Sequence, residues 1–323
     1  MSYFKEEIQK TINDIQDSLE PGDLCFAMLC DSHMSEQGQD TCKNISAVDK
    51  EVGFDFIVHL GNIINGDNPR RVSGYLLNME IERYKNSIEQ KKLFAVQGYT
   101  DGWRDERFAG QLCQFMITDE MWYNATAYID RYDGVSRPGK KPYYYVDLPG
   151  KDIRLIFLCT YSYQIDTRLG LYEKYLCIDV QQQGWLMTEA LCGCKGKTVL
   201  IFSHRIPKSR FETGRDPYFY EGQSTEPVMA IIQQAQMKGV HVACWFGGGY
   251  GYDCEMSIGG IHFTVINSQL PKLNTNSKCD GVRFAENRSL NTINQDCWDA
   301  VLVKNKKKQI EIYRFGCGND RVL

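Results

Sequence analysis

The chain has 323 residues, of which 43% are hydrophobic and 24% charged, and its formal net charge is −4. This composition allows a globular protein with a substantial core, and a charge so close to neutral argues against a nucleic-acid-binding surface. No apolar run approaches the roughly 20 residues that a membrane helix requires, and no secretory signal is recognised at the N-terminus. We therefore expect a cytoplasmic protein that binds neither nucleic acid nor membrane.

In chain order, the first half alternates between helical and strand patterns. Apolar residues at helical spacing predict a helix over residues 3–19 that stops at Pro21-Gly22. Alternation predicts parallel strands joined by crossover helices. The elements expected next are a strand at 24–30, a helix at 43–52, a strand at 55–60, a helix at 72–91 and a strand at 93–97.

The second half is richer in strands. A hairpin is expected at 143–148 and 153–158, and helices near 180–193 and 225–238 precede strands at 198–203 and 240–246. Further strands are expected at 261–266, 300–304 and 309–315. The irregular stretches 102–142 and 206–224 are expected to form loops over one rim. Together these patterns predict one domain over residues 1–323, with an α/β fold of two stacked mixed β-sheets flanked by helices.

Two features near the C-terminus are expected to be turns. The basic run Lys304-Asn305-Lys306-Lys307-Lys308 lies between two apolar segments, which is typical of a solvated hairpin turn rather than a nucleic-acid patch. Gly316 and Gly318 predict a turn that lets Asp320 and Arg321 fold back onto the chain.

Cysteine usage indicates a reducing compartment. The chain has 13 cysteines, an odd number, and most lie in strand-like runs where a free thiol behaves as a small hydrophobe. Cys192 and Cys194 form the only close pair, and no second pair stands at zinc-finger spacing.

Loops that could hold ligands follow five of the predicted strands. In folds of this class, ligand-binding groups gather beyond the carboxyl ends of the strands. The five loops begin with Asp31-Ser32-His33, Gly61-Asn62, Gly98-Tyr99-Thr100-Asp101, His204-Arg205 and Gly247-Gly248-Gly249-Tyr250.

The order of these five segments resembles the calcineurin-like metallophosphoesterase family. Its motifs read Asp-x-His, Gly-Asp, Gly-Asn-His-Asp or Glu, a lone His after a strand, and Gly-His-x-His. The resemblance spans residues 24–321, including the terminal segments 296–301 and 314–321, and it implies a four-layer αββα arrangement. In the family, two divalent metals bridged by the Asp of Gly-Asp orient a phosphate and activate the attacking water.

Transferred residue by residue, the resemblance leaves most of the ligand positions changed. Asp31, His33 and His204 match retained metal ligands. Among the replaced positions, Asn62 stands at the bridging acid, Tyr99 at the second metal's Asn, Gly248 and Tyr250 at the two His of the last motif, and Thr100 at the general-acid His. Asp67, Asp101 and Asp253 lie near the loops and are candidate substitute ligands, although each is more typical of a loop acid.

These replacements predict that two metals are not held. A bridging carboxylate keeps two dications about 3.5–4 Å apart by offsetting their repulsion, and the neutral Asn62 amide does not. Tyr99 is a poor ligand unless ionised, from a reference pKa of about 10, and Gly248 has no side chain. We expect no metal, or one weakly bound Mn, Fe or Zn ion on Asp31 and His33.

Three functions follow from this sequence. The favoured one is a protein of the phosphoesterase fold that does not catalyse, and that binds a phosphate-bearing small molecule or a partner. The pocket rim would then include aromatic residues of 102–142: Trp103, Phe115, Trp122, Tyr123, Tyr128 and Tyr132. The second is an active phosphoesterase for monoesters or diesters that uses one metal or substitute ligands. The third is a purely structural protein of an assembly.

Overall fold

A six-stranded mixed sheet forms one half of the structure, which is a computed structural model describing residues 4–89, 91–102, 117–166, 171–176, 178–206, 225–270, 282–283, 288–289 and 291–323. Its strand order is β16-β15-β14-β1-β2-β3. Strands β1 to β3 are parallel, and β14 to β16 continue the sheet in antiparallel fashion. The bounds are β1 (Leu24–Leu29), β2 (Phe56–His59), β3 (Leu93–Ala95), β14 (Cys297–Lys304), β15 (Gln309–Gly316) and β16 (Arg321–Val322).

An eight-stranded sheet forms the other half, in the order β13-β11-β12-β10-β9-β6-β5-β4. Its four central strands are parallel and its flanking strands antiparallel. The bounds are β4 (Val135–Ser136), β5 (Tyr144–Asp147), β6 (Ile153–Leu158), β9 (Thr198–Ser203), β10 (His241–Gly247), β11 (Asp253–Ile258), β12 (Ile261–Val265) and β13 (Val282–Arg283).

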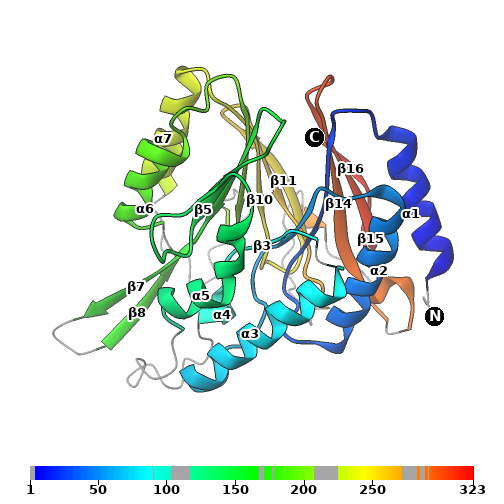
Figure 1. The fold of residues 1–323 in the computed structure, drawn as a ribbon, viewed down its shortest axis with the longest axis horizontal. Helices are drawn as coiled ribbons and strands as arrows, with labels where there is room; N and C mark the ends of the chain where they lie inside the picture. Colours follow the sequence, from blue (N-terminus) through cyan, green and yellow to red (C-terminus); the bar gives the residue numbers. More distant parts are fainter. Residues whose placement is uncertain are drawn as a thin grey trace.

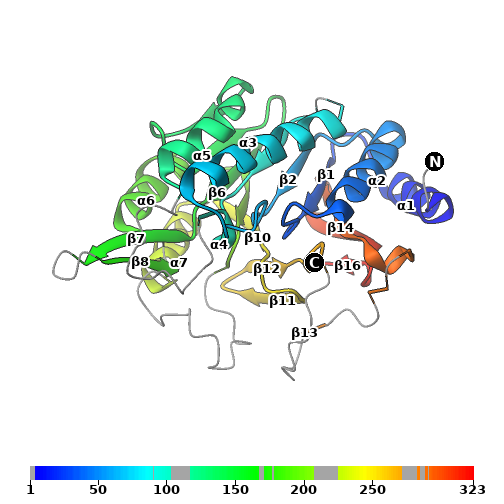
Figure 2. The ribbon, with the colours of Figure 1, turned by 90° about the horizontal axis from the view of Figure 1, so that it is seen from below.

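Helices cover the outer face of each sheet, so the molecule has four layers (Figures 1 and 2). On the six-stranded sheet lie α1 (Lys5–Ser18), α2 (Glu36–Val52), α3 (Arg70–Ser87) and α5 (Asp119–Thr126). On the eight-stranded sheet lie α6 (Val180–Trp185), the π-helical turn Leu186–Ala190 and α7 (Thr225–Met237). A third core cluster fills the space between the sheets. The predicted αββα arrangement is confirmed.

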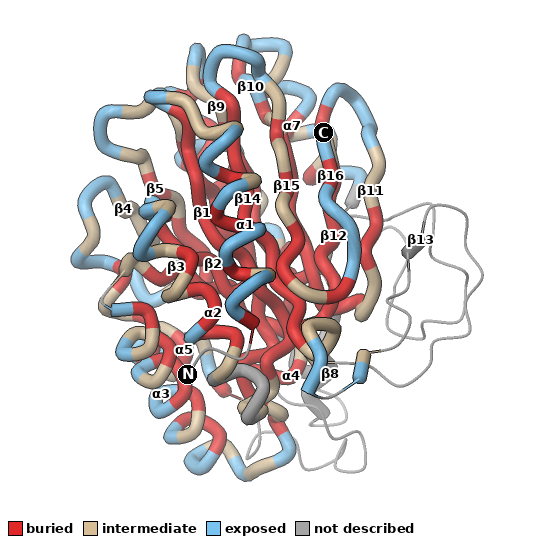
Figure 3. Tube along the Cα trace, turned by 90° about the vertical axis from the view of Figure 1, so that its right-hand side faces the viewer, coloured by how far each residue is buried: buried red, intermediate tan, exposed pale blue. Residues whose placement is uncertain are grey.

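Strand β1 shows why its sequence is apolar throughout. Every residue of the strand is buried, because one face packs against helices and the other against the opposite sheet. Phe26 points into the inter-sheet core, where its ring contacts Phe56 at 4.8 Å and Phe246 at 5.9 Å between centroids. Cys25, by contrast, packs on the helix side. Figure 3 shows the buried strands as the centre of the molecule.

Two predicted helices have different bounds. Helix α2 begins at Glu36, seven residues before the predicted start, because its apolar pattern begins only at Cys42 while its first turns are polar. Helix α3 covers Arg70–Ser87 instead of 72–91, with Ile88 at its C-cap.

The expectation of an irregular stretch at 102–142 is wrong where the structure describes it. Residues 117–142 contain α5, the 3₁₀ turn Ala127–Arg131 and β4. Trp122 is fully buried in the helix-side core and does not line a rim. Tyr128 and Tyr132 pack against the inter-sheet core, and Tyr123 lies under the guanidinium of Arg137 at 5.4 Å. Trp103 and Phe115 lie outside the described residues, as does 207–224.

A two-stranded hairpin, β7 (Tyr161–Asp166) with β8 (Leu171–Leu176), extends beyond β6 and was not predicted. The short α4 (Tyr99–Gly102) and the 3₁₀ turn Ile293–Gln295 were also missed. All of these elements are short and carry little periodic signal.

The C-terminal turns are confirmed with one exception. Asn305 to Lys308 form the exposed turn between β14 and β15, but Lys304 belongs to β14 and is buried against Asp23, with 2.7 Å between Nζ and Oδ2. Gly316 has φ +92°, and a Cβ there would lie 2.0 Å from the carbonyl oxygen of Asp296, so glycine is required. Asp320 then accepts a hydrogen bond from the backbone N–H of Arg314 at 2.7 Å.

Two composition-based expectations concern cysteines and membranes. The ten cysteines in the described part of the chain carry thiols rather than disulfides. Within the same residues, every helix is too short or too polar to cross a bilayer.

Candidate functional site

The loops after β1, β2 and β3 are joined by backbone hydrogen bonds. The N–H groups of Asp31 and His33 donate to the carbonyls of Gly61 and Asn62, both at 3.0 Å. The loops approach closely because Gly98 lacks a side chain: a Cβ there would lie 2.0 Å from the backbone nitrogen of Asn62. This contact brings together the three segments that the sequence places at the site.

The side chain of Asn62 links Asp31 to Thr100. Its Nδ2 donates to Asp31 Oδ1 at 2.7 Å, and its Oδ1 accepts from the backbone N–H of Thr100 at 2.8 Å. A backbone N–H only donates, so the amide oxygen must face Thr100 and the NH₂ group must face the carboxylate. Asp31 and Asn62 are buried and both adopt positive φ, near +60°, which the surrounding structure imposes.

Thr100 and His33 lie beside this pair. The Thr100 hydroxyl donates to the carbonyl of Ile64 at 2.5 Å, and its Oγ1 is 3.5 Å from Nδ1 of the half-buried His33. Because the hydroxyl proton is directed at a carbonyl, Thr100 is not oriented to protonate a leaving group.

Asp101 links the loops after β2 and β3 through its buried carboxylate. Its carboxylate is fully buried and accepts backbone N–H bonds from Asn62, Ile64 and Gly98 at 2.8–2.9 Å. Burial raises the pKa of Asp101 to about 6, and the backbone donors oppose the rise. With its oxygens bonded to three N–H groups of two loops, those after β2 and β3, Asp101 holds these loops together.

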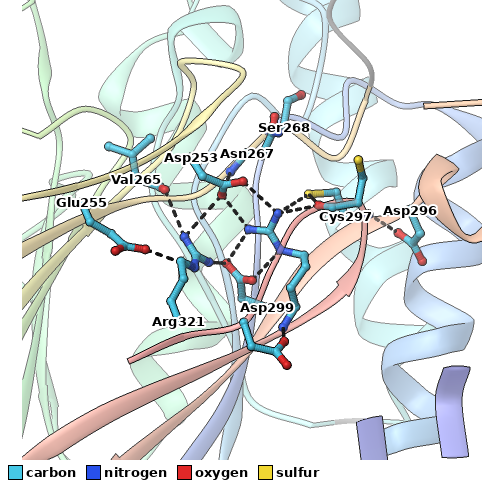
Figure 4. Close-up of polar contacts among 12 residues, drawn as sticks. Asp253, Glu255, Val265, Asn267, Ser268, Asp296, Cys297, Asp299 and Arg321 are labelled. Atoms are coloured by element: carbon cyan, nitrogen blue, oxygen red, sulfur yellow. Dashed lines mark hydrogen bonds and ion pairs between the residues drawn. The ribbon is translucent and has the colours of Figure 1, made fainter. Parts of the chain in front are cut away.

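Asp253 belongs to a buried ionic network that joins the two sheets (Figure 4). It pairs with Arg314 at 2.7 Å and with Arg321 at 3.3 Å, and both arginines also pair with Asp299 of β14. Burial opposes ionisation of Asp299, yet the two guanidiniums hold its pKa below the ordinary value. The Asp253 carboxylate is therefore already engaged by arginines. Asp67, the remaining candidate substitute ligand, is exposed on the loop after β2.

His204 follows β9 on the opposite sheet and reaches the same region. Its Nδ1 lies 2.6 Å from the carbonyl oxygen of Leu60 and 3.9 Å from Sγ of Cys30. The ligand atoms of Cys30, Asp31 and His204 all lie within 4.8 Å of one another, and the three residues are buried. Cys30 was not predicted as a site residue, because in the sequence it continues the apolar run of β1.

The glycine loop after β10 packs directly on this group. A Cβ at Gly248 would lie 2.4 Å from Cys30 Sγ, and a Cβ at Gly249 would lie 2.2 Å from His204 Nε2. At position 248, where the family has a histidine, the structure has no room for one without displacing Cys30.

Aromatic side chains surround the remaining positions. The ring of Tyr250 is buried, with the Arg205 guanidinium 4.0 Å from its centroid. Tyr161, which was not singled out from the sequence, contacts the rings of Tyr99 at 5.7 Å and His204 at 5.8 Å. Tyr161 also lines a cavity of about 350 Å³ whose wall includes Lys141 and Gln182.

His59 and Ser32 form a second unpredicted contact beneath the site. The backbone N–H of Gly61 donates to His59 Nδ1 at 3.1 Å, so Nε2 carries the proton and donates to Ser32 Oγ at 2.9 Å. Burial lowers the pKa of His59 to about 3, which keeps the ring neutral.

Comparisons with known proteins identify the fold. No family model and no curated protein matches the sequence. The structure is similar to a dimetal phosphatase from Danio rerio, with 12% identity, a TM-score of 0.57 and coverage of 94% of this chain and 99% of that chain. Weaker similarities are to GAP50, the anchor in the inner membrane complex of Plasmodium (14% identity, TM-score 0.43, 93% and 90% covered), and to the protein TT1561 of Thermus thermophilus (10%, 0.46, 92% and 99%). Together with the layers and strand order, the first similarity shows that this chain has the calcineurin-like metallophosphoesterase fold.

Proposed function

We propose that this chain is a non-catalytic protein of the metallophosphoesterase fold that binds a phosphate-bearing ligand or partner. The strongest support is the hydrogen-bond pattern of Asn62, which holds its loops together at the position where a bridging acid would hold two metals.

The orientation of the Asn62 amide opposes a bridged metal pair. Its NH₂ group points at Asp31, so a partial positive charge faces the carboxylate that a metal would need. Turning the amide to offer its oxygen to a metal would place NH₂ against the Thr100 N–H, two donors at 2.8 Å. Leaving buried donors unsatisfied costs about 1–3 kcal/mol each.

The second metal position has even fewer side chains that could bind a metal. His204 is the retained family ligand there, the Gly248 backbone packs against Cys30, and Tyr99 and Tyr250 are engaged in ring contacts. A phosphate bound by two metals does not fit these residues, and we assign no hydrolytic step to such a pair.

Ligand binding would use the rim around these loops. Arg205 is half-buried, and its guanidinium is stacked on Tyr250, which limits the entropy that it loses on binding an anion. The neighbouring cavity with Lys141 gives space for the organic part of a phosphate ester.

The competing function is a phosphoesterase with one divalent metal on Asp31 and His33. The His33 imidazole, which is half-buried at the surface of the site, favours it. Asp101 and Asp253 add little as substitute ligands, because backbone donors and arginines already engage their carboxylates.

Metal analysis and hydrolysis assays separate the two functions. Purified protein should contain less than one Mn or Fe ion per chain. With added Mn²⁺, it should hydrolyse phosphomonoesters and diesters no faster than an Asp31→Ala variant does. Turnover at an ordinary enzyme rate that Asp31→Ala abolishes would establish the phosphoesterase instead.

The binding part of the proposal has its own test. A panel of phosphomonoesters should raise the melting temperature of the wild type, and Arg205→Ala should remove that shift. Arg131→Ala, at an exposed arginine on the 3₁₀ turn after α5, is the matched control and should keep it. If both variants respond like the wild type, the ligand does not bind at this rim.

A further inference from the structure

Three buried side chains of different chemistry meet between the two sheets. Cys30 and Asp31 stand at the end of β1, and His204 stands at the end of β9 on the opposite sheet. All three have no exposed surface, and their ligand atoms lie within 4.8 Å of one another. The family motifs assign no role to the residue before the first Asp, so the thiol is an addition of this chain.

The distances approach those of a metal centre. Three atoms no more than 4.8 Å apart leave a point within about 2.8 Å of each, whereas zinc bonds are about 2.0–2.3 Å. Sulfur and nitrogen ligands of one tetrahedral zinc stand about 3.5 Å apart, and Cys30 Sγ is 3.9 Å from His204 Nδ1. Inward movements of about half an ångström by the side chains, together with withdrawal of the Leu60 carbonyl from Nδ1, would complete the coordination.

From this geometry, we propose that Cys30, Asp31 and His204 form a mononuclear zinc site. Thiolate with imidazole selects zinc over Mg²⁺, Ca²⁺ and Mn²⁺, which prefer oxygen ligands. The carbonyl oxygen of Leu60, 3.7 Å from Sγ and 2.6 Å from Nδ1, now accepts a hydrogen bond along the direction that the ion would take. It must draw back from Nδ1 as the ion enters, to about 3.3 Å, and it is then the nearest candidate for a fourth ligand.

Binding requires two proton movements. The Cys30 thiol loses its proton to solvent as the S–Zn bond forms. The imidazole exchanges its Nδ1 proton, which faces Leu60 in the metal-free structure, for one on Nε2, so that the Nδ1 lone pair binds zinc. One proton is released per zinc bound, and no redox change takes place.

The glycine loop explains how the ligands are kept in place. Cys30 Sγ and His204 Nε2 occupy the space that Cβ atoms at positions 248 and 249 would fill, so the glycine backbone lies directly against both side chains. It closes the site from the eight-stranded sheet and limits the movement of both side chains. The zinc site goes beyond the proposed function and is tested separately, because one enclosed zinc ion neither requires nor supplies phosphoester hydrolysis.

Titration of the full chain with Zn²⁺ and Co²⁺ after removal of metal by chelator tests the site. We expect one ion per chain and, with Co²⁺, the near-ultraviolet absorption of a thiolate-to-cobalt charge transfer. Cys30→Ser should abolish that band and weaken Zn²⁺ binding at least about 100-fold. Cys244→Ser is the matched control: this buried thiol lies on β10 and donates to Thr264 Oγ1 at 3.7 Å, outside the cluster. It should keep both the band and the affinity.

X-ray absorption of the zinc-loaded wild type needs no variant and so is independent of how Cys30→Ser folds. The site predicts one sulfur neighbour at about 2.3 Å among nitrogen and oxygen neighbours. Failure to bind Zn²⁺ saturably, a spectrum without a sulfur neighbour, or equal affinity in the folded Cys30→Ser and Cys244→Ser variants would overturn the zinc site. None of these outcomes bears on the phosphoester assays above.

Discussion

Two buried aspartate–asparagine pairs, with hydrogen bonds of almost equal length, lie in different regions of this molecule. Asn62 donates to Asp31 at 2.7 Å at the ends of β1 and β2, and Asn44 of α2 donates to Asp296 at 2.8 Å beside β14. The first pair occupies positions where the fold's relatives are expected to bind metal, and the second has no such counterpart. Because the two hydrogen bonds are alike, the Asn62 amide stabilises the Asp31 carboxylate in the same way as the Asn44 amide stabilises Asp296, which lies outside the candidate site.

Asp299, a third buried aspartate, shows a different way of stabilising a buried carboxylate. Asp296 is held chiefly by the neutral donors Thr41 and Asn44, and burial raises its pKa to about 6. Asp299, three residues later, faces Arg314 and Arg321, and its pKa is lowered. The protein thus stabilises buried acids either with amides and hydroxyls or with permanent cations, and the candidate site uses an amide.

Removing a permanent cation should have the largest effect on stability. Arg314→Met leaves Asp253 and Asp299 with Arg321 alone, and breaking a buried charge network typically costs about 3–5 kcal/mol. Urea unfolding of this variant and of the exposed control Arg131→Met measures the difference. Equal midpoints for the two variants would mean that the ionic network does not stabilise the fold.

Converting each asparagine to aspartate should cost less and should distinguish the two pairs. Asn62→Asp and Asn44→Asp each place two carboxylates together and lose a hydrogen bond to a charged group, for about 3 kcal/mol in chelator. Mn²⁺ should restore the melting temperature of Asn62→Asp, because two acids and His33 then face one cation, and should leave Asn44→Asp unchanged. Equal rescue would show that the ion acts elsewhere.

The pKa of Asp296 gives a prediction for pH dependence. Since its folded pKa of about 6 exceeds the unfolded value, the folded state binds the extra proton between these pKa values, and its contribution to stability falls as pH rises from 4 to 6. Asp296→Asn removes this fall, so the variant should gain about 2–3 kcal/mol relative to the wild type between pH 4 and pH 7. Urea unfolding across that range measures the gain. A constant difference would contradict the raised pKa.

The smallest effect is expected in the glycine loop. Gly248→Ala puts a Cβ 2.4 Å from Cys30 Sγ and should destabilise the protein by about 1–2 kcal/mol. Gly184→Ala in α6 meets open space and should be neutral or slightly stabilising. If thermal unfolding ranks the two variants the other way round, the loop does not press on Cys30.

Much of the frame could be predicted because strand signals and loop positions are local. Apolar runs located β1, β2, β9 and β10, and each was followed by the expected loop. The residue at position 62 also indicated a missing charge. The orientation of its amide could not be predicted, since it depends on the Thr100 N–H 38 residues away in the chain.

Other features were hidden because their signal is tertiary. Cys30 looks like one more small apolar residue of β1, and its proximity to His204 arises only when the two sheets face each other. Trp122 sits in an aromatic, polar stretch that looks like a rim, yet α5 turns the side chain into the core. Because the first turns of α2 are polar, the spacing of apolar residues did not indicate where this helix begins.

Anomalous diffraction from crystals soaked in Mn²⁺ and, separately, in Zn²⁺ tests most directly whether Asn62 prevents a metal pair. The hydrogen bonds from Asn62 predict at most one ion in the space bounded by Asp31, Asn62 and His204. Two well-occupied peaks about 3.5–4 Å apart in that space would contradict it.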